Sequence, residues 1–165
     1  SNRITDNFGC EEGTVNDHMW VIGSRKHPEN DDHRKAFREM NEVLFSMSAN
    51  RSIEGAREKL KPVIDYFEKI KTDYTSNKKH DRKIRYASYF NLAVLYYYLD
   101  DPELMMKEAN GLILNDFHTA VGNSFRETAL RLKNQFQRTN IYTRHFPIDT
   151  NSFKGPTENT ETAIK

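Results

Sequence analysis

The stretch that decides the fold is YFNLAVLYYYLDDPEL, residues 89–104. Its apolar and aromatic residues recur at steps of three and four, which is the spacing of a helix that packs against a neighbour. Asp100-Asp101-Pro102 then interrupts the pattern, and an Asp cap followed by proline at the first helical position is typical of a helix start. The stretch therefore predicts a helix over about 81–99 and a second helix from 102, joined by a tight turn.

The same helical period appears in three further segments. One covers about 32–49, one follows it and contains Pro62, and one follows Asn115-Asp116 and reaches about residue 139. A proline inside a helix removes a backbone hydrogen bond, so we expect Pro62 to bend its helix or to mark a late start. Five amphipathic segments predict an all-α fold.

The two ends of the chain lack this period. Residues 1–31 are rich in Gly, Asn and Asp, and their apolar run, 19–22, predicts a hydrophobic plug packed on the helices. Residues 141–165 are a polar tail punctuated by proline and glycine. We therefore expect a helical domain over 32–140, an irregular N-terminal segment packed on it, and an irregular C-terminal tail.

The first two helical segments align with the next two at a constant offset of 49 residues. A fixed period is typical of stacked repeats, although any two helical hairpins with similar loops can be aligned in this way. The aligned apolar pairs are Met40 with Tyr89, Val43 with Leu92, Leu44 with Ala93, Met47 with Tyr96, Ala56 with Met105, Leu60 with Ala109, and Val63 with Leu112.

Residues 89–96, followed by Asp100-Asp101, resemble the first helix and turn of a tetratricopeptide repeat. The resemblance covers 82–116 and, at fewer positions, 32–73. Met105 departs from the small residue of that family, Phe117 replaces its usual proline, and the period is 49 residues where the family has about 34. The sizes expected at Ala109 and Leu112 are also exchanged. The resemblance implies stacked antiparallel helical hairpins, about two of them plus a capping helix, used mostly as a platform for partners.

The resemblance also implies a binding face. It places four side chains of the third helical segment on the concave side of the stack, with one more from the first segment. These candidate binding residues are Phe45, Phe90, Val94, Tyr97 and Tyr98. Tyrosine suits a half-buried binding surface, because a large apolar ring carries a polar end. The alternative is that the rings pack against the two ends of the chain.

Composition excludes several classes of protein. The chain has 165 residues, a net charge of +1 and a single cysteine. A single cysteine excludes a disulfide scaffold, and the balanced charge disfavours a nucleic-acid partner. No run of about 18 apolar residues occurs, so we expect no membrane span in this segment. An aromatic content of 12% argues against disorder along the whole chain.

We find no catalytic, cofactor or metal motif in the sequence. No glycine-rich phosphate loop and no paired histidines at helical spacing occur. His27, Asp31 and His33 lie close together, and we interpret them as a surface cluster rather than as metal ligands. Residues 78–85 hold five basic side chains, which we interpret as a solvated loop and helix start.

Our leading hypothesis is therefore a non-enzymatic protein-interaction or assembly module with a protein or peptide partner and no cofactor. The alternative is a module that binds a ligand such as a glycan, with Tyr97, Tyr98 or Trp20 as stacking platforms. The opening Ser1-Asn2 fits either a processed start or a cloning remnant. Similarity to envelope proteins with such repeats leads us to expect part of an exported bacterial protein, located in the cell envelope after removal of an N-terminal signal.

Overall fold

The described part of the chain is built from helices. The computed structural model describes residues 28–134 and 140–147, with the backbone alone described for 28–30. Its elements in chain order are α3 Pro28–Asn50, α4 Ala56–Asp73, α5 Lys79–Tyr98, α6 Pro102–Leu114, α7 Thr119–Lys133 and a 3-10 turn, η2 Ile141–Thr143. No strand occurs in these two ranges, so the predicted all-α class is confirmed for them.

The helix starts follow from local sequence. The Asp101 carboxylate accepts a hydrogen bond from the backbone N–H of Leu104 at 3.1 Å, and Pro102 is the first helical residue, as predicted. α3 begins at Pro28, earlier than the predicted Asp32, and proline is favoured at the first helical position. α4 begins at Ala56 and contains Pro62, so the alternative of a late start is wrong.

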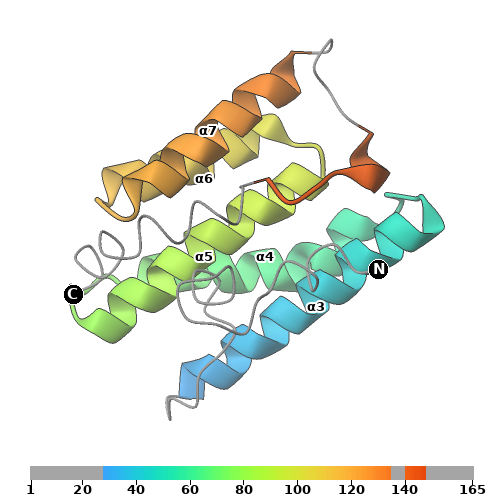
Figure 1. Cartoon of the computed structure of the whole chain (residues 1–165). Helices are drawn as coiled ribbons and strands as arrows, with labels where there is room; N and C mark the ends of the chain where they lie inside the picture. Colours follow the sequence, from blue (N-terminus) through green and yellow to red (C-terminus); the bar gives the residue numbers. More distant parts are fainter. Residues whose placement is uncertain (1–27, 135–139, 148–165) are drawn as a thin grey trace.

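α5 lies at the centre of the helices (Figure 1). From Ile84 to Tyr98 every residue is buried except Tyr89, which is half-buried. α5 packs against α4 and α6 and touches α3, and its Phe90 ring meets the Phe125 ring of α7 at 5.0 Å between centroids. The C-terminal half of α5, residues 92–98, is apolar or aromatic at every position, and a helix of this kind belongs in a core because it has no polar face to meet water.

The helices pack in the order in which they occur in the chain. α3 contacts α4, α4 contacts α5, α5 contacts α6 and α6 contacts α7. Short connections favour antiparallel neighbours, and Figure 1 shows the progression from blue α3 to orange α7. Alternate helices also meet: α3 with α5, α5 with α7, and α4 with α6 through an ion pair described below.

The turns that end α3 and α5 have the same geometry. Arg51 follows α3 with φ 49°, and Asp100 lies shortly after α5 with φ 60°. Each left-handed residue is followed by a backbone N–H that bonds back over one helical turn, the arrangement of a Schellman motif. These two bonds are Ser52 N–H to Met47 O at 3.2 Å and Asp101 N–H to Tyr96 O at 2.9 Å. Both bonds and both left-handed residues are separated by the 49-residue offset seen in the sequence.

Burial follows the same offset. Of the seven aligned pairs, five are buried in both copies. The exceptions are the pairs that contain Val43 and Tyr89, which are half-buried. Most of the aligned apolar positions are therefore buried in both helical pairs.

Two sequence interpretations need correction. His33 is fully buried and its ring meets the edges of Tyr66 and Phe67, so it does not lie in a surface cluster. Arg85 is buried, donates to the carbonyls of Tyr74 and Ser76 and lies over a phenyl ring, so this member of the basic stretch is not solvated. The predicted plug at 19–22 lies outside the described residues.

Candidate functional site

The structure places four of the five predicted binding residues in the core. Phe90, Val94 and Tyr98 are fully buried, and Tyr97 is 7% exposed. Phe45 on α3 is 44% exposed. The stripe on α5 is therefore not an open patch, which agrees with the alternative that chain ends pack against it.

Residues 140–147, called here the C-terminal segment, lie along the face formed by α3, α5 and α7 (Figure 1). One hydroxyl from each of these three helices donates to a backbone carbonyl of the segment. The bonds are Ser48 Oγ to Tyr142 O at 3.1 Å, Tyr97 Oη to His145 O at 2.7 Å, and Thr128 Oγ1 to Pro147 O at 3.2 Å. The helices thus hold the segment by its main chain.

Arg144 fastens the middle of the segment. Its guanidinium is buried, donates to Tyr97 O at 2.7 Å and to the Asp100 carboxylate at 2.9 Å, and lies 5.2 Å from the centre of the Tyr97 ring. Charge-assisted hydrogen bonds and a cation–π contact are among the stronger polar interactions in proteins. Asp100 is the left-handed residue of the turn after α5, so this turn is also the receptor for Arg144.

Apolar contacts complete the docking of the segment. The Phe146 ring stacks on Phe90 at 6.4 Å between centroids, and Pro147 is buried. The side chain of His145, which lies between Arg144 and Phe146 in the sequence, is exposed. The segment therefore alternates between side chains that enter the helical face and one that does not.

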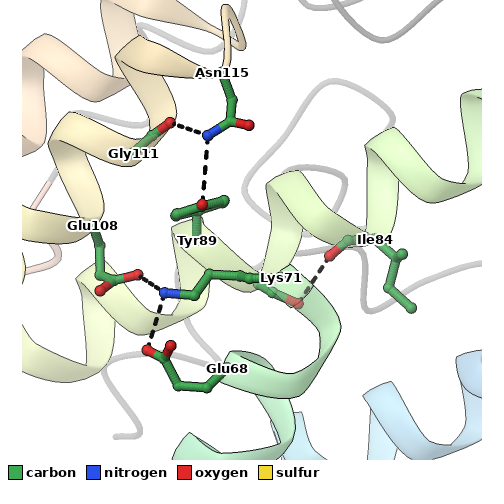
Figure 2. Close-up of polar contacts among 8 residues, drawn as sticks. Glu68, Lys71, Ile84, Tyr89, Glu108, Gly111 and Asn115 are labelled. Atoms are coloured by element: carbon green, nitrogen blue, oxygen red, sulfur yellow. Dashed lines mark hydrogen bonds and ion pairs between the residues drawn. The ribbon is translucent and has the colours of Figure 1, made fainter. Parts of the chain in front are cut away.

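A second polar cluster lies where α4 meets α6, away from the C-terminal segment (Figure 2). Lys71 Nζ lies 2.6 Å from a carboxylate oxygen of Glu108 and 3.0 Å from one of Glu68. The Lys71 side chain is 9% exposed and that of Glu108 is 1% exposed. This ion pair is buried and joins helices that are not consecutive in the chain.

The two partners bind their protons more tightly than they do in water. Burial alone would lower the pKa of Lys71, but the charge and hydrogen bond of Glu108, with those of Glu68, outweigh it and raise the pKa. The pKa of Glu108 is also raised, because its burial outweighs the attraction of Lys71. Lys71 thus stays protonated and has no free lone pair with which to attack a substrate.

The Tyr89 ring lies next to this ion pair. Lys71 Nζ lies 4.7 Å from the centre of its ring, and Asn115 Nδ2 donates to its hydroxyl at 3.4 Å and to Gly111 O at 2.7 Å. A Cβ atom at residue 111 would come within 2.3 Å of the Tyr89 ring, so glycine is required for this approach. Above these residues lies an open pocket of about 460 Å³, rimmed by the exposed Leu114.

The two sites differ in what they can do. In the pocket over Lys71 and Glu108 these two groups are paired with each other, so Lys71 offers no free amine as a nucleophile. No group of three or more His, Cys, Asp or Glu in the described ranges is arranged to hold a metal ion. The face that binds the C-terminal segment offers hydroxyl donors, a carboxylate and an aromatic platform, which together suit an extended peptide.

Arg144, Lys71 and Glu108 were missed by the sequence reasoning. Arg144 stands where the helical period has ended, and no pattern marks a single arginine there as buried. Lys71 and Glu108 occupy polar positions of amphipathic helices, where the default expectation is exposure. A signal for the burial of the α5 stripe was present, since residues 92–98 of that helix are all apolar or aromatic.

No family model matches this chain, and neither a curated protein nor a solved structure matches it. No described helix has the combination of length and apolar character that a membrane crossing requires.

Proposed function

We propose that this chain is a helical-repeat interaction module related in architecture to tetratricopeptide repeats. In this proposal α3 with α4 and α5 with α6 are stacked hairpins, and α7 is the capping helix. The order of helix contacts supports it, because each helix meets its first and second neighbours, as in a solenoid. The turns at Arg51 and Asp100 share one geometry at the 49-residue offset and fit the proposal, and the turn after α6 at Asp116 has this geometry as well.

The module binds an extended protein segment on the face formed by α3, α5 and α7. The single observation that carries this proposal is the set of three hydroxyls, one from each helix, that hold the backbone carbonyls of residues 140–147. A face that binds main-chain carbonyls is suited to peptides of varied sequence, because every peptide presents them. Phe45 lies three residues before Ser48 on α3, so it borders this face and is exposed to a partner.

No specific observation favours the glycan alternative. Tyr97 and Tyr98 are buried, so neither ring has an open face on which a sugar would stack, and Trp20 lies outside the described residues. We therefore retain the interaction module as the proposed function.

Site-specific photo-crosslinking tests the proposal. A benzophenone amino acid replaces Phe45 in one full-length variant and Leu114, on the rim of the pocket above Lys71, in a matched one. We expect a discrete adduct at position 45 in source-cell extract that disappears when excess peptide of residues 140–147 is added. An adduct at position 114 that the peptide does not compete would contradict the proposal and place the partner at the pocket above Lys71.

A further inference from the structure

We infer that the C-terminal segment is an internal ligand whose chemistry specifies the partner: an extended peptide with arginine, any residue, an aromatic residue and proline in that order. This inference rests on the proposed function, because it concerns the same face of α3, α5 and α7. It adds which side chains the partner carries and what the partner has to displace.

The contacts of the segment show which of its side chains the helices recognise and which they leave exposed. The guanidinium of Arg144 meets Asp100 and the Tyr97 carbonyl, the ring of Phe146 stacks on Phe90, and Pro147 is buried. The intervening His145 side chain is exposed, so only its carbonyl is used, by the Tyr97 hydroxyl. A partner peptide with the same spacing presents the same groups to the same receptors.

The binding site of the Arg144 side chain favours a guanidinium over an ammonium group. Asp100 supplies one anionic acceptor and the carbonyl of Tyr97 a second acceptor, while the guanidinium lies over the Tyr97 ring at 5.2 Å from its centre. Guanidinium is planar and donates in several directions, whereas an ammonium is a compact point charge. Lysine at this position would therefore fill the site less well than arginine.

Tethering makes the segment a competitor of the partner. A ligand tethered to its receptor has a local concentration commonly on the order of mM, so a partner in solution binds only after the segment leaves. Loss of the Arg144 contacts weakens the internal ligand and leaves the receptor groups on the helices in place. Such a variant should bind, at low concentration, a peptide in trans that the parent chain binds only when the peptide is in large excess.

The experiment uses the full-length chain and a fluorescent peptide with the sequence of residues 140–147. Anisotropy measures binding of this peptide to the parent chain, to the Arg144→Ala chain and to a control with Arg126→Ala, an exposed arginine on α7. We expect at least about tenfold tighter binding by Arg144→Ala than by the other two chains. Peptides that carry Arg144→Ala or Phe146→Ala should bind the Arg144→Ala chain at least about tenfold more weakly than the parent peptide.

A second measurement does not depend on the stability of that variant. Excess isotope-labelled peptide is added to the parent chain, and hydrogen exchange of residues 140–147 is followed by mass spectrometry. We expect faster exchange of the displaced segment, with no such change when the peptide carries Arg144→Ala.

The outcomes separate the inference from the proposed function. Equal binding of parent and substituted peptides to the Arg144→Ala chain would overturn the arginine–aromatic specificity and leave a general peptide-binding face. No binding of any peptide to a folded Arg144→Ala chain, together with unchanged exchange in the parent chain, would overturn both. The segment would then be a permanent part of the core.

Discussion

The two polar sites of this protein lie on different faces of the helical layer and are built differently. On the face of α3, α5 and α7, neutral hydroxyls meet main-chain carbonyls, and a single arginine provides the charged contact. Between α4 and α6, Lys71 and Glu108 are buried against each other and no chain segment lies between them. The first site holds a separate chain segment largely through its main chain, whereas the second joins two helices through a buried ion pair.

This contrast explains why the more charged site is the weaker candidate for binding. A buried ion pair is costly to separate, because each partner would be left in a poorly solvating environment. When the C-terminal segment leaves, water replaces the hydroxyl–carbonyl hydrogen bonds at little cost. The Arg144–Asp100 pair also separates, but Arg144 leaves with the segment into water, and Asp100 is already 28% exposed. Reversible binding is therefore expected on the face that holds residues 140–147.

The largest effect is expected at the ion pair. Lys71→Met leaves Glu108 buried without its cation and should lower the free energy of unfolding by about 3–5 kcal/mol. The double variant Lys71→Met, Glu108→Leu should recover most of this loss, since both charges are removed together. Urea denaturation of the single and double variants measures both effects.

An exposed ion pair provides the matched control. Lys61 and Asp65 are both exposed and lie 2.8 Å apart on α4, so Lys61→Met should cost at most about 0.5 kcal/mol. A Lys71→Met loss no larger than this would show that the cluster between α4 and α6 does not stabilise the fold.

The next largest loss of stability is expected in α5, the central helix. Leu92 is fully buried on α5, and Leu92→Ala should cost about 2–5 kcal/mol through the cavity that it leaves. Lys107→Ala, at an exposed position of α6, should cost well under about 1 kcal/mol. Thermal unfolding followed by circular dichroism compares the two variants, and equal costs would contradict the central position of α5.

A pH-dependent effect of intermediate size is expected at Tyr96. Burial, together with the negative charge of Glu108, raises the pKa of Tyr96 from 10.0 to about 12. The unfolded chain thus loses this proton first as the pH rises, so the stabilisation is complete below pH 10 and is lost as the pH passes through about 12. The loss across this window corresponds to about 2–3 kcal/mol.

The measurement for Tyr96 is urea denaturation at a series of alkaline pH values. Tyr96→Phe removes the titrating hydroxyl, so the stability of that variant should fall less steeply across the same window. Identical slopes for the parent and Tyr96→Phe chains would assign the alkaline loss to another group.

The smallest effect belongs to the face that holds the C-terminal segment. Tyr97→Phe keeps the ring and removes the hydroxyl that donates to His145 O, which should cost about 0.5–1.5 kcal/mol. Thr143→Ala removes an exposed hydroxyl from the same segment and should stay within about 0.5 kcal/mol. Hydrogen exchange of residues 140–147 should accelerate in the first variant only, and equal exchange in both would remove Tyr97 from the docking of the segment.

Much of the helical architecture could be predicted from the sequence, and the reason is physical. Apolar spacing reports which residues face other helices, and Asp101-Pro102 is a local signal that forms the same cap in any context. Which helix or segment packs against a given helix face depends on residues that are far apart in the sequence. The stripe containing Phe90 and Tyr97 therefore had two consistent interpretations, an open groove or a covered one, until the position of Arg144 and Phe146 was known.

Charged residues were the least predictable part of both sites. Lys71 and Glu108 lie in different helices and are 37 residues apart in sequence, so no local pattern connects them. Arg144 acts through Asp100, 44 residues earlier, and both belong to stretches without helical period. Their pairing depends on the packing of the whole layer.

The turns that end α3 and α5 have one further consequence. Each presents a left-handed residue at the same edge of its helical pair, but one of these residues is Arg51 and the other is Asp100. The backbone of the two turns is equivalent, so by geometry alone either turn could bind a guanidinium. Opposite charge makes Arg51 repel a guanidinium and Asp100 attract one, so of these two turns the one after α5 is the one that receives Arg144.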